Sequence, residues 1–180
     1  MISPSLAWDQ ARLLPYAPEH DAQTIAWLNS EDLRATFGLS QPATCDSHRK
    51  WVEGAVDVLV WALSDGTGTH CGNVLVHVNL RHRSGYFQIY IGRAASRGQG
   101  LGRSALAAVL AHVFGAAGLH RVWLHTLPGN TAAEVLYRRA GFVAEGEERD
   151  AIWRDGKFAS QTRWSILEPE WRRHGAAADR

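Results

Sequence analysis

The stretch that decides the fold is Arg97-Gly98-Gln99-Gly100-Leu101-Gly102, between a predicted strand and a predicted helix. Glycines let the backbone approach a ligand closely and turn several N–H groups in one direction. The helix that follows adds partial positive charge at its N-terminus, so the segment suits a phosphate or pyrophosphate. The same six residues could also form a plain structural turn, and the loop alone does not decide between the two.

Two better-known glycine motifs do not match this loop. A dinucleotide fingerprint reads G-x-G-x-x-G and has an acidic residue about twenty positions later. Here the third glycine comes one residue early, and Leu119–Val122 contains no acid. A P-loop has Lys and then Ser or Thr after its last glycine, whereas Gly102 is followed by Arg103.

The segments around the loop predict an α/β sheet with helices against it. Runs rich in β-branched and aromatic residues, separated by turn residues, indicate strands, and a 3.6-residue apolar spacing indicates helices. The predicted strands cover Val56–Leu63, Gly72–Leu80, Tyr86–Ile91, Arg121–Thr126, Phe142–Glu147 and Thr162–Leu167. The predicted helices cover Ala22–Leu33, Ser47–Ala55, Ser104–Gly115 and Asn130–Ala140.

Length and composition limit the class of protein. A chain of 180 residues fits one domain, and we predict a single domain over 1–170 with a flexible tail over 171–180. A net charge of +1 provides no bulk field for nucleic acid, and no run approaches the ~20 apolar residues that span a bilayer. Cys45 and Cys71 form neither a disulfide framework nor a metal-binding spacing, so we expect no metal and a cytoplasmic location.

Two motifs resemble the GNAT superfamily of N-acetyltransferases. The loop is similar to the family's R/Q-x-x-G-x-G/A motif, with Arg97, Gly100 and Gly102 in the motif positions. A second stretch resembles N-x-x-A-x-x-x-Y-x-x-x-G-F, through Asn130, Ala133, Leu136-Tyr137 and Gly141-Phe142. The continuation over Phe142–Gly146 resembles the RimJ/RimL-like branch, which is similar to spermidine and amino-sugar acetyltransferases. The resemblance covers Tyr86–Leu167, and the first eighty residues match only in outline.

This resemblance implies a central mixed, mostly antiparallel sheet of about seven strands flanked by four helices. It also implies acetyl-CoA as co-substrate and direct transfer to a primary amine in a ternary complex. The expected acceptor is a small-molecule amine, such as an amino sugar or a polyamine, or else a protein N-terminus; a homodimer stays open. Two alternatives remain: a transferase of this fold that uses another acyl donor such as aminoacyl-tRNA, and a non-catalytic CoA-binding sensor.

The resemblance also implies a set of cofactor-binding residues. Backbone N–H groups of the loop would bind the pyrophosphate, and the end of the Tyr86–Ile91 strand would pair with the pantetheine amides where it splays from the Arg121–His125 strand. The set comprises Ile91, Gly92, Arg93, Arg97, Gly98, Gln99, Gly100, Leu101, Gly102, Arg103, Asn130, Ala133 and Tyr137.

Tyr137 is the candidate general acid, because a phenol of pKa about 10 can protonate a thiolate whose conjugate acid has a pKa of about 8.5. A packed helix tyrosine is the alternative. Many family members carry a Glu on the strand before the loop, but Tyr86–Tyr90 contains no carboxylate. His125, and after it His77, are therefore the candidate bases, directly or through water; a structural histidine is the alternative for each.

Overall fold

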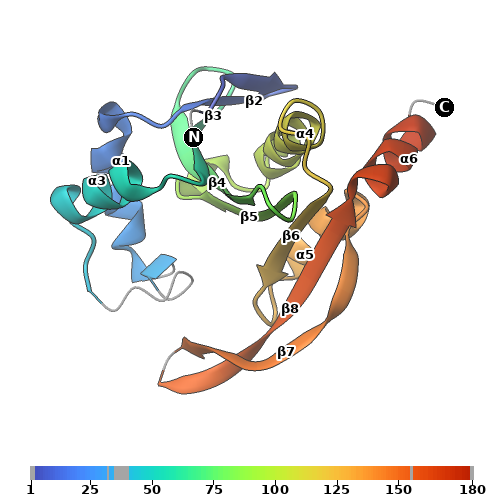
Figure 1. Cartoon of the computed structure of the whole chain (residues 1–180). Coiled ribbons are helices and arrows are strands. Elements are labelled where there is room, and N and C mark those ends of the chain that lie inside the picture. Colours follow the sequence, from blue (N-terminus) through green and yellow to red (C-terminus); the bar gives the residue numbers. More distant parts are fainter. Residues whose placement is uncertain (1–2, 32, 35–40, 155, 179–180) are drawn as a thin grey trace.

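Eight strands form one sheet in the computed structural model, which describes residues 3–31, 33–34, 41–154 and 156–178 (Figure 1). The strand order is β1-β2-β3-β4-β5-β6-β8-β7, and β5–β6 is the one parallel neighbour pair in this described sheet. The strands are β1 (Leu6–Trp8), β2 (Ala11–Pro15), β3 (Val58–Ser64), β4 (His70–Asn79), β5 (Ser84–Ile91), β6 (Arg121–Thr126), β7 (Val143–Arg154) and β8 (Lys157–Leu167).

The predicted α/β class with a mixed, mostly antiparallel sheet is confirmed, with eight strands in place of about seven. The sequence reading missed the first hairpin, β1–β2, because three and five residues are too short to establish a two-residue period. The last two predicted strands, Phe142–Glu147 and Thr162–Leu167, are too short, because β7 continues to Arg154 and β8 begins at Lys157. The two strands form a long hairpin that stands away from the rest of the molecule (Figure 1).

Five α-helices are described, in place of the four expected, and they cover both faces of the sheet (Figure 1). They are α1 (Asp21–Leu28), α3 (Cys45–Gly54), α4 (Leu101–Phe114), α5 (Thr131–Arg139) and α6 (Glu168–Ala178). The larger core cluster joins α4 and Tyr137 of α5 to one face, and the smaller cluster joins Trp27 of α1 to the other.

Strand alternation decides which side chain enters which cluster, since neighbouring residues of a strand point to opposite faces. In β5, Phe87 enters the α4 cluster and Tyr90 enters the α1 cluster. In β3, Trp61 faces α4 and Val60 faces α1. Burial on both faces explains why β3 and β4 read as nearly continuous apolar runs rather than as alternating ones.

The last turns of the chain differ from the predicted flexible tail. Helix α6 follows β8 directly, and Trp171 packs against the larger core cluster with its ring 5.4 Å from that of Phe114. His174 Nε2 donates to the carbonyl of Arg139 at 2.9 Å. An aromatic side chain that finds an apolar surface anchors a terminal helix, so the stretch 171–174 belongs to the folded body. None of the helices in the described ranges is long and apolar enough to cross a membrane.

Candidate active site

The parallel ladder between β5 and β6 stops after three residue pairs. Ser84 pairs with Arg121, Gly85 with Val122 and Tyr86 with Trp123. Beyond these pairs β5 runs on to Ile91, and in the described sheet that edge of the strand has no neighbouring strand. Backbone N–H and C=O groups that lie inside a protein need partners, so the open edge of β5 can pair with an extended ligand.

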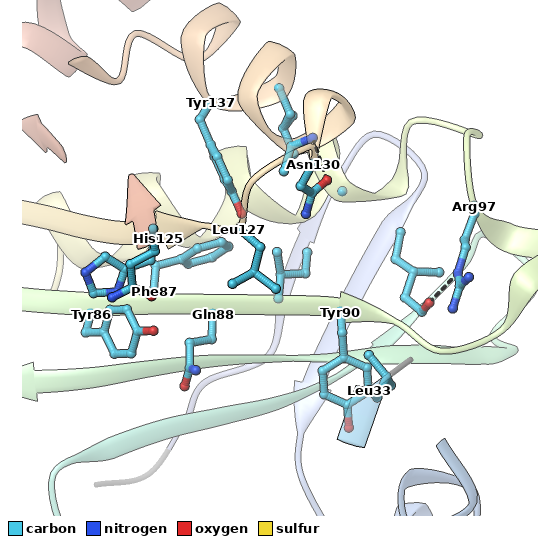
Figure 2. A pocket seen from close by; sticks show the side chains of 16 residues that line it. Leu33, Tyr86, Phe87, Gln88, Tyr90, Arg97, His125, Leu127, Asn130 and Tyr137 are labelled. Atoms are coloured by element: carbon cyan, nitrogen blue, oxygen red, sulfur yellow. Dashed lines mark hydrogen bonds between the residues drawn. The ribbon is translucent and has the colours of Figure 1, made fainter. Parts of the chain in front are cut away.

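A cavity of about 490 Å³ occupies this gap (Figure 2). Its walls are the second half of β5, the end of β6, the glycine loop and the start of α5. Six of the predicted cofactor-binding residues line it: Ile91, Arg97, Gly102, Asn130, Ala133 and Tyr137. Two motifs that are some 35 residues apart in the sequence are therefore brought to one cavity.

The glycine loop leads directly into the N-terminus of α4. Gly98 and Gly100 adopt left-handed backbone angles, with φ of 73° and 82°. Helix α4 begins after Gly100 without a side-chain cap, so its first N–H groups keep their full donor capacity. Among the described residues, the amides of Gly98, Gln99 and Gly100 donate to none of the backbone acceptors outside helices and strands. These donors and the helix terminus fit a pyrophosphate.

Some of the predicted cofactor-binding residues also make contacts that hold the loop in place. Arg97 Nε donates to the carbonyl of Ile91 at 2.9 Å, which ties the loop to the end of β5 (Figure 2). Arg103 pairs with Asp9 at 3.5 Å and is exposed, and the Gln99 carbonyl accepts from the Gln10 side chain. Leu101 is buried in the core under the loop.

Gly92 and Arg93, at the predicted pantetheine end of β5, do not line this cavity. A Cβ at Gly92 would lie 2.1 Å from the Trp27 ring, so close packing explains this glycine. The amide of Arg93 donates to the Cys71 carbonyl at 3.0 Å, and its guanidinium lies 3.7 Å from Asp65.

Tyr137 reaches the cavity from α5, and Figure 2 shows its hydroxyl pointing toward β5. The helix is fixed at its start by Asn130, whose Oδ1 accepts from the Ala133 amide at 3.3 Å. The side chain of Tyr137 is buried, with 6% of its surface exposed. Burial, and then the neighbouring Tyr86, raise the pKa of the Tyr137 phenol above its usual range. The hydroxyl therefore keeps its proton and is available as a donor.

His125 lines the same cavity from β6. Its Nε2 lies 2.9 Å from Glu148 Oε2, but the two groups are not aligned as a hydrogen bond. Among the described residues this buried nitrogen has no other hydrogen-bond partner. Glu148 also accepts from Gln161 at 2.7 Å and lies 2.5 Å from Arg163. Gln161 first, and then His125 and Arg163, lower the pKa of Glu148.

A second cavity, of about 440 Å³, lies on the opposite face of the sheet, between β3–β5 and helices α1 and α3. Gln88 and Tyr90 line both cavities, and Figure 2 shows their side chains on the side of β5 away from Tyr137. His77 lines the second cavity and donates from Nε2 to Gln88 Oε1 at 3.0 Å. The two histidines proposed as bases therefore lie at different cavities.

An acetyltransferase (GNAT) domain model matches residues 11–143. The chain belongs to the GNAT acetyltransferase family. The match covers strands β2–β6 and every residue that lines the cavity around β5 and β6 except Gln161. It also includes residues 11–80, where the motif resemblance was only in outline.

Relatives agree with this assignment. A spermidine N(1)-acetyltransferase of Vibrio cholerae is 32% identical over 97 residues, which are 54% of this chain and 56% of that protein. The chain thus spans little more than half the length of this relative. A putative ribosomal N-acetyltransferase of Bacillus subtilis, YdaF, is 28% identical over 167 residues, which are 84% of this chain and 88% of that protein.

Solved structures share the fold. The crystal structure of spermidine N-acetyltransferase from Vibrio cholerae in complex with CoA and spermine has a TM-score of 0.84 and 22% identity. It covers 91% of this chain and 98% of that chain. At this identity the likeness shows the fold alone.

Sequence reasoning missed the residues that join the two cavities, Gln88 and Tyr90. The available signal was the two-residue alternation of β5, which places Tyr86, Gln88 and Tyr90 on one face. The partners supplied by the N-terminal third, such as Tyr16 and His48, had no comparable signal, because only the tertiary fold brings them to β5.

Proposed function

We propose that this chain is an N-acetyltransferase that moves the acetyl group of acetyl-CoA to a primary amine by direct transfer in a ternary complex. The observation that carries the proposal is the open edge of β5, with a cavity on each face of the sheet and Gln88 and Tyr90 shared between them. One cavity suits the donor and the other the acceptor, so the two substrates would meet at one strand.

On the donor side, the glycine loop and the N-terminus of α4 would bind the pyrophosphate of acetyl-CoA. The free edge of β5 up to Ile91 would pair with the pantetheine amides, because a parallel neighbour is missing there. The bound co-substrate supplies an acetyl thioester, whose carbonyl carbon is open to attack. An N–H of β5 that points into the gap could polarise that carbonyl.

Tyr137 and a histidine divide the proton transfers between them. The amine nitrogen forms a bond to the acetyl carbon, and the carbon–sulfur bond breaks. Tyr137 donates its proton to the departing thiolate and regains a proton from the acylated nitrogen, directly or through water. An amine of pKa ~10 first has to lose a proton from its ammonium form. His77, at the acceptor cavity, and His125, at the donor cavity, are the two candidate bases. The net products are the acetamide, CoA and the proton released by the ammonium group.

We rank a small-molecule acceptor ahead of a protein N-terminus. A cavity of about 440 Å³ falls within the range of small-ligand sites. The relatives' names supply one example of each class, a polyamine and a ribosomal protein, so both belong in the first screen. Within the fold, an aminoacyl-tRNA donor would make turnover strongly dependent on salt.

The first experiment is a thermal shift with acetyl-CoA, CoA, NAD and ATP, followed by thiol release with an amine panel. A ligand at about 100 times its dissociation constant stabilises a fold by roughly 2.7 kcal/mol, which is easily measured. A shift with acetyl-CoA and CoA alone, together with amine-dependent thiol release, supports the proposal. A shift with acetyl-CoA or CoA but no thiol release with any amine would indicate a CoA sensor. Absence of a shift with both acetyl-CoA and CoA would contradict the donor site.

A further inference from the structure

The walls of the second cavity are apolar and aromatic. Leu28, Trp51, Val60 and Leu75 contribute apolar surface from α1, α3, β3 and β4. Trp51 is 41% exposed although it is large and apolar, and its ring stacks on that of His48 at 5.8 Å. An exposed tryptophan on the wall of a cavity is surface that a ligand with an apolar body would cover.

The polar groups that line this cavity are hydroxyl, amide and imidazole groups, and most are already paired within the protein. Asn73 donates to Thr24 Oγ1 at 2.8 Å and to the Tyr90 hydroxyl at 2.5 Å. His77 is bonded to Gln88, and His48 Nε2 lies 3.0 Å from the Tyr16 hydroxyl. These groups can orient a ligand, but being paired within the protein they provide few free acceptors for a second ammonium group of that ligand.

No carboxylate lines the cavity among the residues that the structure describes. Asp21 lies behind the wall, where its Oδ1 accepts from the Tyr16 hydroxyl at 3.0 Å and its Oδ2 lies 3.3 Å from Arg49. Its charge is therefore already balanced by a cation of the protein. Glu31 is exposed and lines neither cavity, and Asp32 lies outside the described residues.

Resting on the proposed N-acetyltransferase function, we propose that the acceptor is a primary amine with an uncharged, apolar or aromatic body, and not a polyamine. A polyamine brings further ammonium groups, each of which would lose water in a cavity whose described walls are largely apolar and hold no carboxylate to pair with. An arylalkylamine or alkylamine buries only its apolar body there, against Trp51 and Leu75. This specificity would separate the chain from relatives that are named for spermidine.

The decisive comparison uses acceptors that differ by one charge. Hexylamine and 1,6-diaminohexane have the same carbon chain, and 2-phenylethylamine and spermidine extend the comparison to an aromatic body and to a natural polyamine. Thiol release is measured at saturating acetyl-CoA. We expect kcat/KM for hexylamine and 2-phenylethylamine to exceed that for the diamine and spermidine at least tenfold. Equal or higher values for the diamine or spermidine would overturn the inference and leave the acetyltransferase proposal standing.

Two variants test the wall itself. Trp51→Ala should raise KM for 2-phenylethylamine at least fivefold with little change in kcat, whereas Trp153→Ala, an exposed aromatic on the distant hairpin, should change neither. Arg49→Gln leaves Asp21 without its cation, so the ratio of kcat/KM for the diamine to that for hexylamine should rise. Thermal unfolding checks that each variant is folded. An unchanged KM for Trp51→Ala would contradict the assigned wall.

The two proposals fail in different ways. Absence of thiol release with every amine, while acetyl-CoA still shifts the unfolding temperature, would overturn the acetyltransferase proposal and this inference with it. Aromatic rings can also attract cations. If that attraction decided specificity, spermidine would be favoured and Trp51→Ala would weaken spermidine most, which is the opposite of the expected result.

Discussion

The hydroxyl group of Tyr137 should be needed for acetyl transfer but not for the binding of acetyl-CoA. Tyr137→Phe keeps the ring that packs 5.5 Å from Phe142 and removes only the proton donor. We expect kcat to fall by about 10²–10⁴-fold, the usual contribution of a general acid, while acetyl-CoA still shifts the unfolding temperature as it does in the parent. Steady-state thiol release and thermal shift measure the two quantities. Unchanged turnover would show that Tyr137 is a packing residue.

The interactions of the Glu145 carboxylate should make the free energy of unfolding depend on pH. Arg121 donates to both of its carboxylate oxygens at 2.6 Å and Ser165 donates at 2.8 Å. Arg121 first, and then Ser165, lower the pKa of Glu145 from 4.5 to about 2. A carboxyl whose pKa is depressed by folding stabilises the fold above its unfolded pKa, and this contribution is lost as pH falls through the folded value.

Glu145→Gln should therefore make the free energy of unfolding less dependent on pH between about 4.5 and 2. Because the pair is partly exposed, the loss at pH 7 should be about 1 kcal/mol or less. Urea unfolding at stepped pH values measures both effects. Glu147→Gln, an exposed residue on the same strand, is the control. If the free energy of unfolding of Glu145→Gln changed with pH in parallel with that of the parent, Arg121 would not lower the pKa of Glu145 as assigned.

At the residue scale, the sequence could indicate which side chains lie close together wherever a motif fixed their spacing, while their roles stay predictions. Asn130 and Tyr137 lie two turns apart on one helix, so the pattern alone placed both at one cavity. Arg97 was predicted to contact the cofactor. Its Nε also donates a hydrogen bond to the carbonyl of Ile91 at the end of β5, a contact that no local sequence pattern could indicate. Asp21, Tyr16 and His48 meet through packing of α1 against α3, and neither local period nor spacing encodes that contact.

At the scale of an element, β4 tolerates nothing larger than a glycine at position 72. A Cβ at Gly72 would lie 2.0 Å from the Tyr90 carbonyl oxygen, where β4 and β5 pair. Because backbone cannot swing aside as a flexible side chain can, we expect Gly72→Ala to cost about 1–3 kcal/mol or more. Urea unfolding measures this cost. Gly66→Ala, in a turn with open space around it, should stay within about 0.5 kcal/mol; equal losses in the two variants would contradict the stated cause.

Element boundaries show what the sequence could not determine. Helix α3 was predicted over Ser47–Ala55, but it begins at Cys45, with Thr44 as its N-cap and Ser47 completing the capping box three residues later. Both residues are good caps, so the pattern alone could not choose. Strand β7 continues to Arg154 through charged residues that are exposed, where no burial produces an alternating pattern.

For the molecule as a whole, the C-terminal helix should contribute to stability. Trp171→Ala removes the ring that packs on Phe114 and the larger core cluster. Since Trp171 is only partly buried, we expect a loss of about 1–3 kcal/mol, below the range for fully buried aromatics. Arg173→Ala, an exposed residue of the same helix, should change little, and chemical unfolding compares them. A flexible tail would make both variants neutral.

The three-pair ladder between β5 and β6 also has a consequence for motion. In the described sheet it is the only backbone pairing between β1–β5 on one side and β6, β8 and β7 on the other. Local opening should therefore begin at this seam, where few hydrogen bonds have to break. A ligand paired with the free edge of Phe87–Ile91 would act as a short extra strand. Amide hydrogens on that edge should exchange with solvent deuterium quickly in the free protein and slowly once acetyl-CoA is bound, so that the donor would complete the sheet it binds to.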